Sequence, residues 1–202
     1  YDYKNRLVEK KIPGKGREYI IYDQLDRPVL TQDANLRSVN NNSIIDDKKW
    51  LFTKYDALGR VIYTGLYTHS LVIDRSSMQS YFDTQNNMAD KYYEEKLTSE
   101  GALGIYYSSS DFPNSNLEVL TVNYYDNYVF DRGSGIGTTA TSYGVNSTSN
   151  VKGLATGTKV KVLDSSSWIT TINYYDDKAR PIYVYSKNDF LNTEIALLNQ
   201  RI

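Results

Sequence analysis

The sequence predicts a mainly β protein, built as an array of antiparallel β-hairpins that form a curved sheet, with one amphipathic helix inserted near residues 77–96. The first observation behind this prediction is a short pattern that recurs along the chain, Tyr-Asp-x-x-z-Arg followed by apolar residues. The second is the content of 20 tyrosines against 5 phenylalanines, because tyrosine suits a strand with one dry and one wet face. The third is physical: one hairpin cannot bury its own apolar face, whereas several hairpins side by side can.

The clearest copy of the pattern lies within residues 52–65. A strand rich in aromatic and β-branched residues ends at Tyr55, and a return strand follows Arg60. Between them, Asp56 can accept hydrogen bonds from backbone N–H groups of the turn, and Gly59 can adopt φ > 0 without a Cβ clash. These residues predict a hairpin that closes with a type I turn followed by a left-handed residue.

Further copies begin at Tyr1, Tyr22 and Tyr175, and a degenerate copy at Tyr124 lacks the arginine. The residues assigned to the structural repeat motif are Tyr22, Asp23, Arg27, Tyr55, Asp56, Gly59, Arg60, Tyr175, Asp176 and Arg180. The position before the arginine holds Asn5, Asp26, Gly59 or Ala179. Three of these residue types tolerate the left-handed region well, so Ala179 is the exception and leaves open a different turn there.

Hairpins with the pattern Tyr-Asp-x-x-Gly-Arg resemble the YD repeats of Rhs proteins, which also occur in insecticidal toxin-complex proteins and in the teneurins. The run from Tyr55 to Gly65 and the run from Leu117 to Asp126 look like Rhs-type proteins of Bacteroidetes. The resemblance covers the chain in patches and thins over residues 66–116 and 131–159. It implies a β-hairpin spiral that forms part of a hollow shell, which often encloses a toxic C-terminal domain, in a bacterial protein that is secreted or displayed at the cell surface.

Composition limits the classes of partner. The formal net charge of −1 gives no nucleic-acid footprint. The chain has no cysteine, which excludes disulfides and thiolate sites, and no apolar run approaches the roughly 20 residues of a membrane helix. Because it starts within a repeat at Tyr1, without an initiating methionine, the chain is expected to be one fragment of a longer hairpin array, spanning residues 1–202. Its expected partners are neighbouring repeats and an enclosed C-terminal toxin domain.

In chain order, the pattern predicts hairpin strands at either side of each turn and three departures from this rhythm. Hairpins are expected over residues 17–33 and 50–67, and the tail of another over residues 1–12. Strands are expected over residues 117–130, 160–163, 167–175 and 180–186, with a loop at 34–49. The first departure is a helical insertion at 76–97: apolar residues from Met78 to Tyr93 fall at helical spacing, which predicts a helix from about Ser77 to about Lys96, with Ser76 and Gln79 as a capping box. Its apolar stripe is expected to pack on the sheet, and a partner-binding groove is the alternative.

The second departure is a long segment, residues 99–116, that is expected to be loop with one short strand at 105–107. The third is a Gly/Ser/Thr-rich loop excursion at 131–159. Residues 190–202 fit either a short helix or the first strand of a next repeat, and the Rhs-like context favours the strand.

No catalytic, cofactor-binding or metal-binding residues are predicted. The run from Gly135 to Ala140 matches G-x-G-x-x-A but lacks the following helix of a dinucleotide site. His69 is the only histidine, and there is no Gly-x-Ser-x-Gly motif to pair with it. The carboxylate pairs Asp46-Asp47, Glu94-Glu95 and Asp176-Asp177 are adjacent, so in a strand they point to opposite faces. No Asp-Pro dipeptide occurs, so this segment is not expected to hold the self-cleavage site of some Rhs-type proteins.

Two other function classes stay open. A carbohydrate-binding or adhesive surface would be favoured by tyrosine and tryptophan exposed in a line, and disfavoured by their burial between repeats. An enzyme is the weaker alternative, because no reactive constellation can be assembled from the residues.

Overall fold

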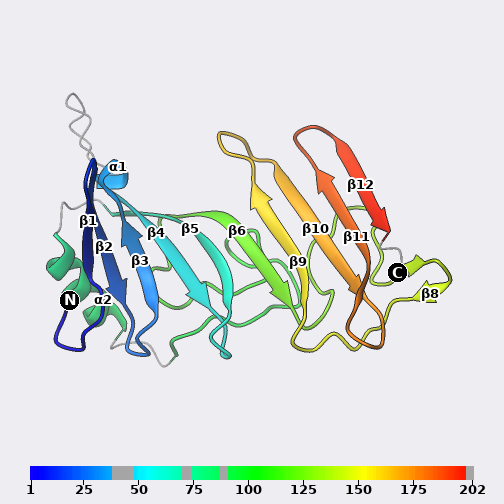
Figure 1. Cartoon of the computed structure of the whole chain (residues 1–202), viewed down its shortest axis with the longest axis horizontal. Coiled ribbons are helices and arrows are strands. Elements are labelled where there is room, and N and C mark those ends of the chain that lie inside the picture. The colour runs from blue at the N-terminus through cyan, green and yellow to red at the C-terminus, as the bar shows by residue number, and fades with distance from the viewer. Residues whose placement is uncertain (38–47, 70–73, 87–90, 199–202) are drawn as a thin grey trace. The chain divides into compact units, whose positions relative to one another are not determined.

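The chain folds as a mainly β protein. The structure is a computed structural model that describes residues 1–37, 48–69, 74–86 and 91–198. Ten strands form one antiparallel sheet in the order β1-β2-β3-β4-β5-β6-β9-β10-β11-β12 (Figure 1). They are β1 (Glu9–Ile12), β2 (Lys15–Tyr22), β3 (Pro28–Gln32), β4 (Lys48–Tyr55), β5 (Val61–His69), β6 (Leu117–Tyr125), β9 (Ala155–Lys161), β10 (Trp168–Tyr175), β11 (Pro181–Asn188) and β12 (Thr193–Leu198).

Two short helices and a small hairpin accompany the sheet. The helices are α1 (Ala34–Arg37) and α2 (Arg75–Asn86), and the small hairpin pairs β7 (Thr141–Ser142) with β8 (Val145–Asn146). The chain divides into two compact units, one of residues 1–95 and 108–119 and the other of residues 96–107 and 120–202.

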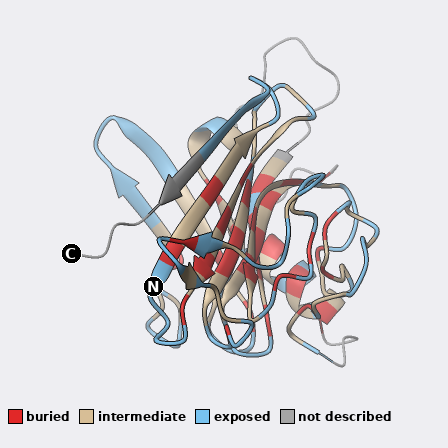
Figure 2. Cartoon of the chain, turned by 90° about the vertical axis from the view of Figure 1, so that its right-hand side faces the viewer, coloured by how far each residue is buried: buried red, intermediate tan, exposed pale blue. Residues whose placement is uncertain are grey.

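In the first unit the strands bury one face. Registry places Ile21 opposite Leu30, Leu30 opposite Phe52 and Phe52 opposite Gly65, and all four are buried. Side chains that point to the other face of these strands, such as that of Leu51, are more exposed to solvent. This alternation follows from the two-residue period of a strand. Figure 2 shows buried residues running through the strands, whereas the turns are exposed.

The inserted helix is shorter than the sequence pattern indicates. α2 ends at Asn86, and residues 91–96 are not helical, so the prediction of a helix reaching Lys96 is wrong. Met78 and Phe82 do lie on its buried side, as expected for the stripe. Tyr92 instead belongs to an irregular segment, where its hydroxyl donates to the Gln24 side chain at 2.9 Å. Met88 and Ala89, also counted in that stripe, lie outside the described residues.

The helix is capped two residues earlier than predicted. Asp74 is the N-cap: its Oδ1 accepts from the backbone N–H groups of Ser76 and Ser77 at 2.8 and 3.0 Å. A Ser76–Gln79 capping box is therefore wrong, because Gln79 faces the sheet and pairs with the backbone of Tyr22. Aspartate is as good an N-cap as serine, and nothing in the local pattern separates the two.

The second unit is built on stacked aromatic rings. Tyr124 lies between Tyr107 and Phe130, with ring centroids 5.4 and 4.4 Å away and planes within 6° and 4° of parallel. Phe130 sits directly on Gly157 of β9, where an added Cβ would lie 2.4 Å from the Phe130 Cζ. Glycine at this position therefore lets the ring approach the strand backbone.

The long excursion between β6 and β9 covers the buried face of the second unit. β6 ends at Tyr125, so the strand predicted to reach Phe130 is five residues too long. Irregular chain with the β7–β8 hairpin then continues to Leu154, and β9 begins at Ala155, inside the stretch predicted as loop. At the C-terminal side, the strand interpretation is confirmed by β12, which pairs with β11 over Thr193–Leu198.

Candidate functional site

The recurring turn has one geometry in four places. In each copy the aspartate backbone N–H donates to the arginine carbonyl oxygen at 2.9–3.1 Å. One carboxylate oxygen of the aspartate accepts two backbone N–H groups, each at 2.9 Å. The other accepts the arginine Nε at 2.6–2.8 Å. The aspartates are Asp2, Asp23, Asp56 and Asp176, and the arginines are Arg6, Arg27, Arg60 and Arg180. The aspartate of each motif is therefore an internal turn cap, whose carboxylate is satisfied within its own hairpin.

The residue before each arginine adopts the left-handed conformation. Its φ is 59° at Asn5, 60° at Asp26, 77° at Gly59 and 59° at Ala179. The interpretation that Ala179 marks a different turn is thus wrong: this alanine is held in the same geometry, at the cost of Cβ strain. The hydrogen bonds of the motif hold Ala179 in this conformation.

The degenerate copy keeps the hairpin and replaces its turn. Tyr125 pairs with Ala155 with the same local shift in register that Tyr55 shows with Val61. The Asp126 N–H donates to the Leu154 carbonyl at 3.1 Å, the bond that an arginine accepts in the complete copies. Asp126 Oδ1 accepts the Gly153 N–H at 2.6 Å. The excursion thus occupies the place of a four-residue turn, which explains the missing arginine.

Successive hairpins are joined by contacts between the arginine of one motif and the tyrosine of the next. The Arg27 guanidinium lies over the Tyr55 ring, 4.5 Å from its centroid, and the Tyr55 hydroxyl donates to the Pro28 carbonyl at 2.7 Å. In the same way, the Arg6 guanidinium lies 4.7 Å from the centroid of the Tyr22 ring, and the Tyr22 hydroxyl donates to the Leu7 carbonyl oxygen at 2.9 Å. The structure thus brings Arg27 to Tyr55, which the sequence assigned to separate copies.

The same hydroxyl contact recurs in the second unit. There the Tyr175 hydroxyl donates to the Ala155 carbonyl at 2.7 Å. Ala155 follows Leu154, the residue that stands where the other copies have arginine. The tyrosine contact therefore survives where the arginine is absent.

The charge state of the caps follows from these bonds. The side-chain hydrogen bond from Arg180 holds the pKa of the Asp176 carboxyl well below its usual range. Burial alone would raise the pKa of Asp2, but hydrogen bonds from Arg6 and Lys4 outweigh it and lower that pKa. Both carboxylates are therefore ionised acceptors at neutral pH, as a turn cap requires, and are not proton donors.

A buried ion pair lies under the first unit's sheet, and the sequence interpretation missed it. The Lys54 Nζ is 3.1 Å from Glu94 Oε1, and the two side chains are 2% and 0% exposed. Glu94 also accepts hydrogen bonds from Ser108 Oγ at 2.6 Å, Ser110 N at 2.9 Å and Asp111 N at 3.1 Å. Desolvation lowers the pKa of Lys54. For Glu94, burial would raise the pKa, but the Lys54 charge and these hydrogen bonds lower it.

Asp111 completes this cluster. The Lys54 ammonium donates to its backbone carbonyl, and its Oδ1 is buried without a hydrogen-bond partner. Burial raises the pKa of Asp111 to about 6, although the Lys54 charge works against the rise. One signal could have revealed the cluster: Lys54 alternates with Trp50 and Phe52 on the inward side of β4 and so had to be buried.

The other residues singled out in the sequence are His69, the run from Gly135 to Ala140 and the pair Asp46-Asp47. His69 is buried against Tyr67 and Tyr81, with ring centroids 5.8 and 5.1 Å away. The run from Gly135 to Ala140 is irregular chain and is followed by β7, not by a helix. Asp46 and Asp47 lie outside the described residues. Across the described parts of the chain, no group of three histidine or acidic side chains is placed to hold a metal ion.

Taken together, the motif residues close the turns of the hairpins and contact the tyrosine of the next motif. Of the helices in the described residues, none has the length and apolar character needed to span a membrane. No family model, curated protein or solved structure matches the chain.

Proposed function

We propose that this chain is a structural segment of an Rhs-like, exported bacterial protein, in which hairpins stacked in a curved array build a wall that encloses or displays a C-terminal effector. The observation that carries the proposal is the repeated interface: the arginine cap of one motif stacks on the tyrosine of the next, whose hydroxyl bonds the preceding hairpin. Such a contact serves neighbours of the same kind, which is what a repeat array requires.

The self-satisfied turns support the same role. Each aspartate uses both carboxylate oxygens as hydrogen-bond acceptors within its own turn, and each arginine donates its Nε–H to that aspartate. Carboxylates that accept three hydrogen bonds within a turn fix the geometry of that turn and are poorly placed to act as a general base. We therefore assign the motif to assembly of the wall and not to chemistry.

The alternative of a carbohydrate-binding array face receives less support. Trp50, Tyr63, Tyr124 and Tyr174 are almost fully buried, and Tyr22 and Tyr55 are covered by arginines. The tyrosines that are strongly exposed among the described residues are Tyr1, Tyr3 and Tyr143. Tyr1 and Tyr3 share one turn and Tyr143 belongs to the β7–β8 hairpin, so none of the three lies on a strand of the ten-stranded sheet.

Negative-stain electron microscopy of the natural protein at full length tests the proposal. A closed particle with a hollow interior is the expected result. A solid or extended particle would contradict enclosure and would make open display the better proposal. A hydrolase screen gives the second arm: turnover that is lost in His69→Ala would make the protein an enzyme and overturn a purely structural role.

A further inference from the structure

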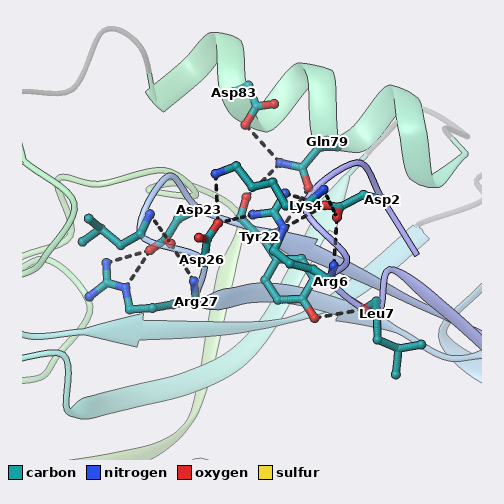
Figure 3. A network of polar contacts seen from close by, with 11 residues as sticks. Asp2, Lys4, Arg6, Leu7, Tyr22, Asp23, Asp26, Arg27, Gln79 and Asp83 are labelled. Atoms are coloured by element: carbon teal, nitrogen blue, oxygen red, sulfur yellow. Dashed lines mark hydrogen bonds and ion pairs between the residues drawn. The ribbon is translucent and has the colours of Figure 1, made fainter.

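A polar groove of about 500 Å³ lies beside the first turn of the chain. Its walls are the turn that holds Tyr3 and Lys4, the end of β2 at Tyr22, and one side of α2. Figure 3 shows Gln79 and Asp83 on α2 facing the turn that contains Lys4. The volume lies in the range of small-molecule sites in proteins. All of its lining residues belong to the first unit.

One cation in this groove, Arg75, has no partner among the residues that the structure describes. The Arg75 Nε is buried without a hydrogen-bond acceptor, and no hydrogen bond or ion pair joins its guanidinium to another described residue. Arg75 opens α2, where a positive charge opposes the helix dipole. Helix stability therefore does not explain this arginine. Its five N–H donors suit an oxygen-rich anion such as a carboxylate.

The other groups along the same wall suit hydroxyls. Arg75, Gln79 and Asp83 follow one another at four-residue spacing, so they share a face of α2 and span about 12 Å. The Gln79 side chain binds the Tyr22 backbone and donates to Asp83 Oδ1 at 3.0 Å, which orients that carboxylate. Asp83 and Ser80 are both lining residues of the groove.

Tyr3 supplies an aromatic surface at the rim. Its side chain is 88% exposed and lines the groove. An exposed ring beside planar polar side chains matches a sugar, which has apolar C–H faces and hydroxyl edges. A peptide would need apolar pockets or an open strand edge, and nucleic acid would need an excess of basic residues. The lining has no excess of basic residues, because its lysine and arginines (Lys4, Arg6, Arg75) are matched in number by its aspartates (Asp2, Asp23, Asp83).

We propose that this groove binds an acidic saccharide, with the sugar carboxylate on Arg75, hydroxyls on Asp83 and Ser80, and a ring face on Tyr3. The inference does not rest on the wall function, since a wall segment and an independent domain can each carry such a groove.

Calorimetric titration with trigalacturonic acid, and with galactotriose as its neutral counterpart, tests the proposal. We expect millimolar binding of trigalacturonic acid and about tenfold weaker binding of galactotriose, the loss of one charge-assisted contact. Arg75→Gln is expected to remove the preference for the acidic sugar, and Tyr3→Ala to weaken the binding of both. Tyr143→Ala and Lys152→Gln alter exposed residues outside the groove and are expected to bind like the unmodified protein.

Three outcomes would overturn the proposal: no binding of trigalacturonic acid by the unmodified protein, unchanged binding in Arg75→Gln with an unchanged melting temperature, or full competition by sodium acetate at equal concentration. The last result would show a bare anion site without sugar recognition.

Discussion

At the residue scale, the fold depends on four aspartates that each close a turn and on the left-handed residue that follows three positions later. The equivalence of Asn5, Asp26, Gly59 and Ala179 makes the cost of that conformation measurable within one protein. Open space surrounds the missing Cβ of Gly59, so substitutions there report backbone strain and not crowding.

Gly59→Val is therefore expected to lower the free energy of unfolding by about 1–2 kcal/mol, because a β-branched residue resists φ > 0. Gly59→Asn is the matched control and is expected to cost much less, since asparagine already occupies the same position at Asn5. Conversely, Ala179→Gly is expected to stabilise the protein. Urea unfolding measures all three, and equal stability of the valine and asparagine variants would refute the turn geometry.

Asp111 gives a pH dependence opposite to that of the turn caps. Its folded pKa is about 6, above the ordinary value of 3.8, so the folded state holds the proton more tightly than the unfolded chain. The contribution of Asp111 to stability is therefore full below about pH 4 and is lost as the pH rises through about 6. The full difference is on the order of 3 kcal/mol.

Asp111→Asn is expected to flatten this dependence, because asparagine does not titrate. Thermal unfolding between pH 5 and pH 7 is the measurement, with Asp177→Asn, an exposed carboxylate, as control. A melting temperature that falls equally in both variants as pH rises would show that Asp111 is ordinarily ionised in the folded state.

At the element scale, the covering segments are fastened to the sheet by a few side chains. Lys54 of β4 holds Glu94 and the Asp111 carbonyl, and Phe130 of the excursion rests on Gly157 of β9. Hairpin strands were predictable because turn signals and alternation are local. The Lys54–Glu94 pair was not, because it joins residues 40 positions apart.

Lys54→Met is expected to destabilise the first unit by about 3–5 kcal/mol, because it leaves the buried Glu94 carboxylate without its cation. The double variant Lys54→Met/Glu94→Gln is expected to recover part of that loss. Chemical denaturation compares the two, and a single variant as stable as the unmodified protein would mean that the pair is open to water.

Gly157→Ala is expected to destabilise the second unit by about 1–3 kcal/mol, since the new methyl would overlap the Phe130 ring. In a Phe130→Leu background the same substitution is expected to cost less, because leucine can move aside. Additive losses in the double variant, measured by urea unfolding, would argue against the direct contact.

At the scale of the whole molecule, the proposed wall requires that hairpins be coupled to their neighbours. The sequence predicted the mainly β fold and placed the repeat motif, because both follow from spacing and residue type. It could not reveal that an arginine and a tyrosine from successive motifs meet, since register between hairpins is a property of the folded sheet. The central claim is that this contact joins the hairpins.

A double-mutant cycle on Arg27 and Tyr55 measures that contact most directly. Arg27→Met, Tyr55→Leu and the double variant are compared by urea unfolding with the unmodified protein. A coupling energy of about 0.5–2 kcal/mol is expected for a guanidinium over a tyrosine ring that also bonds the neighbouring backbone. A coupling energy within about 0.3 kcal/mol of zero would contradict the account, because the hairpins would then be adjacent without being joined by their motif.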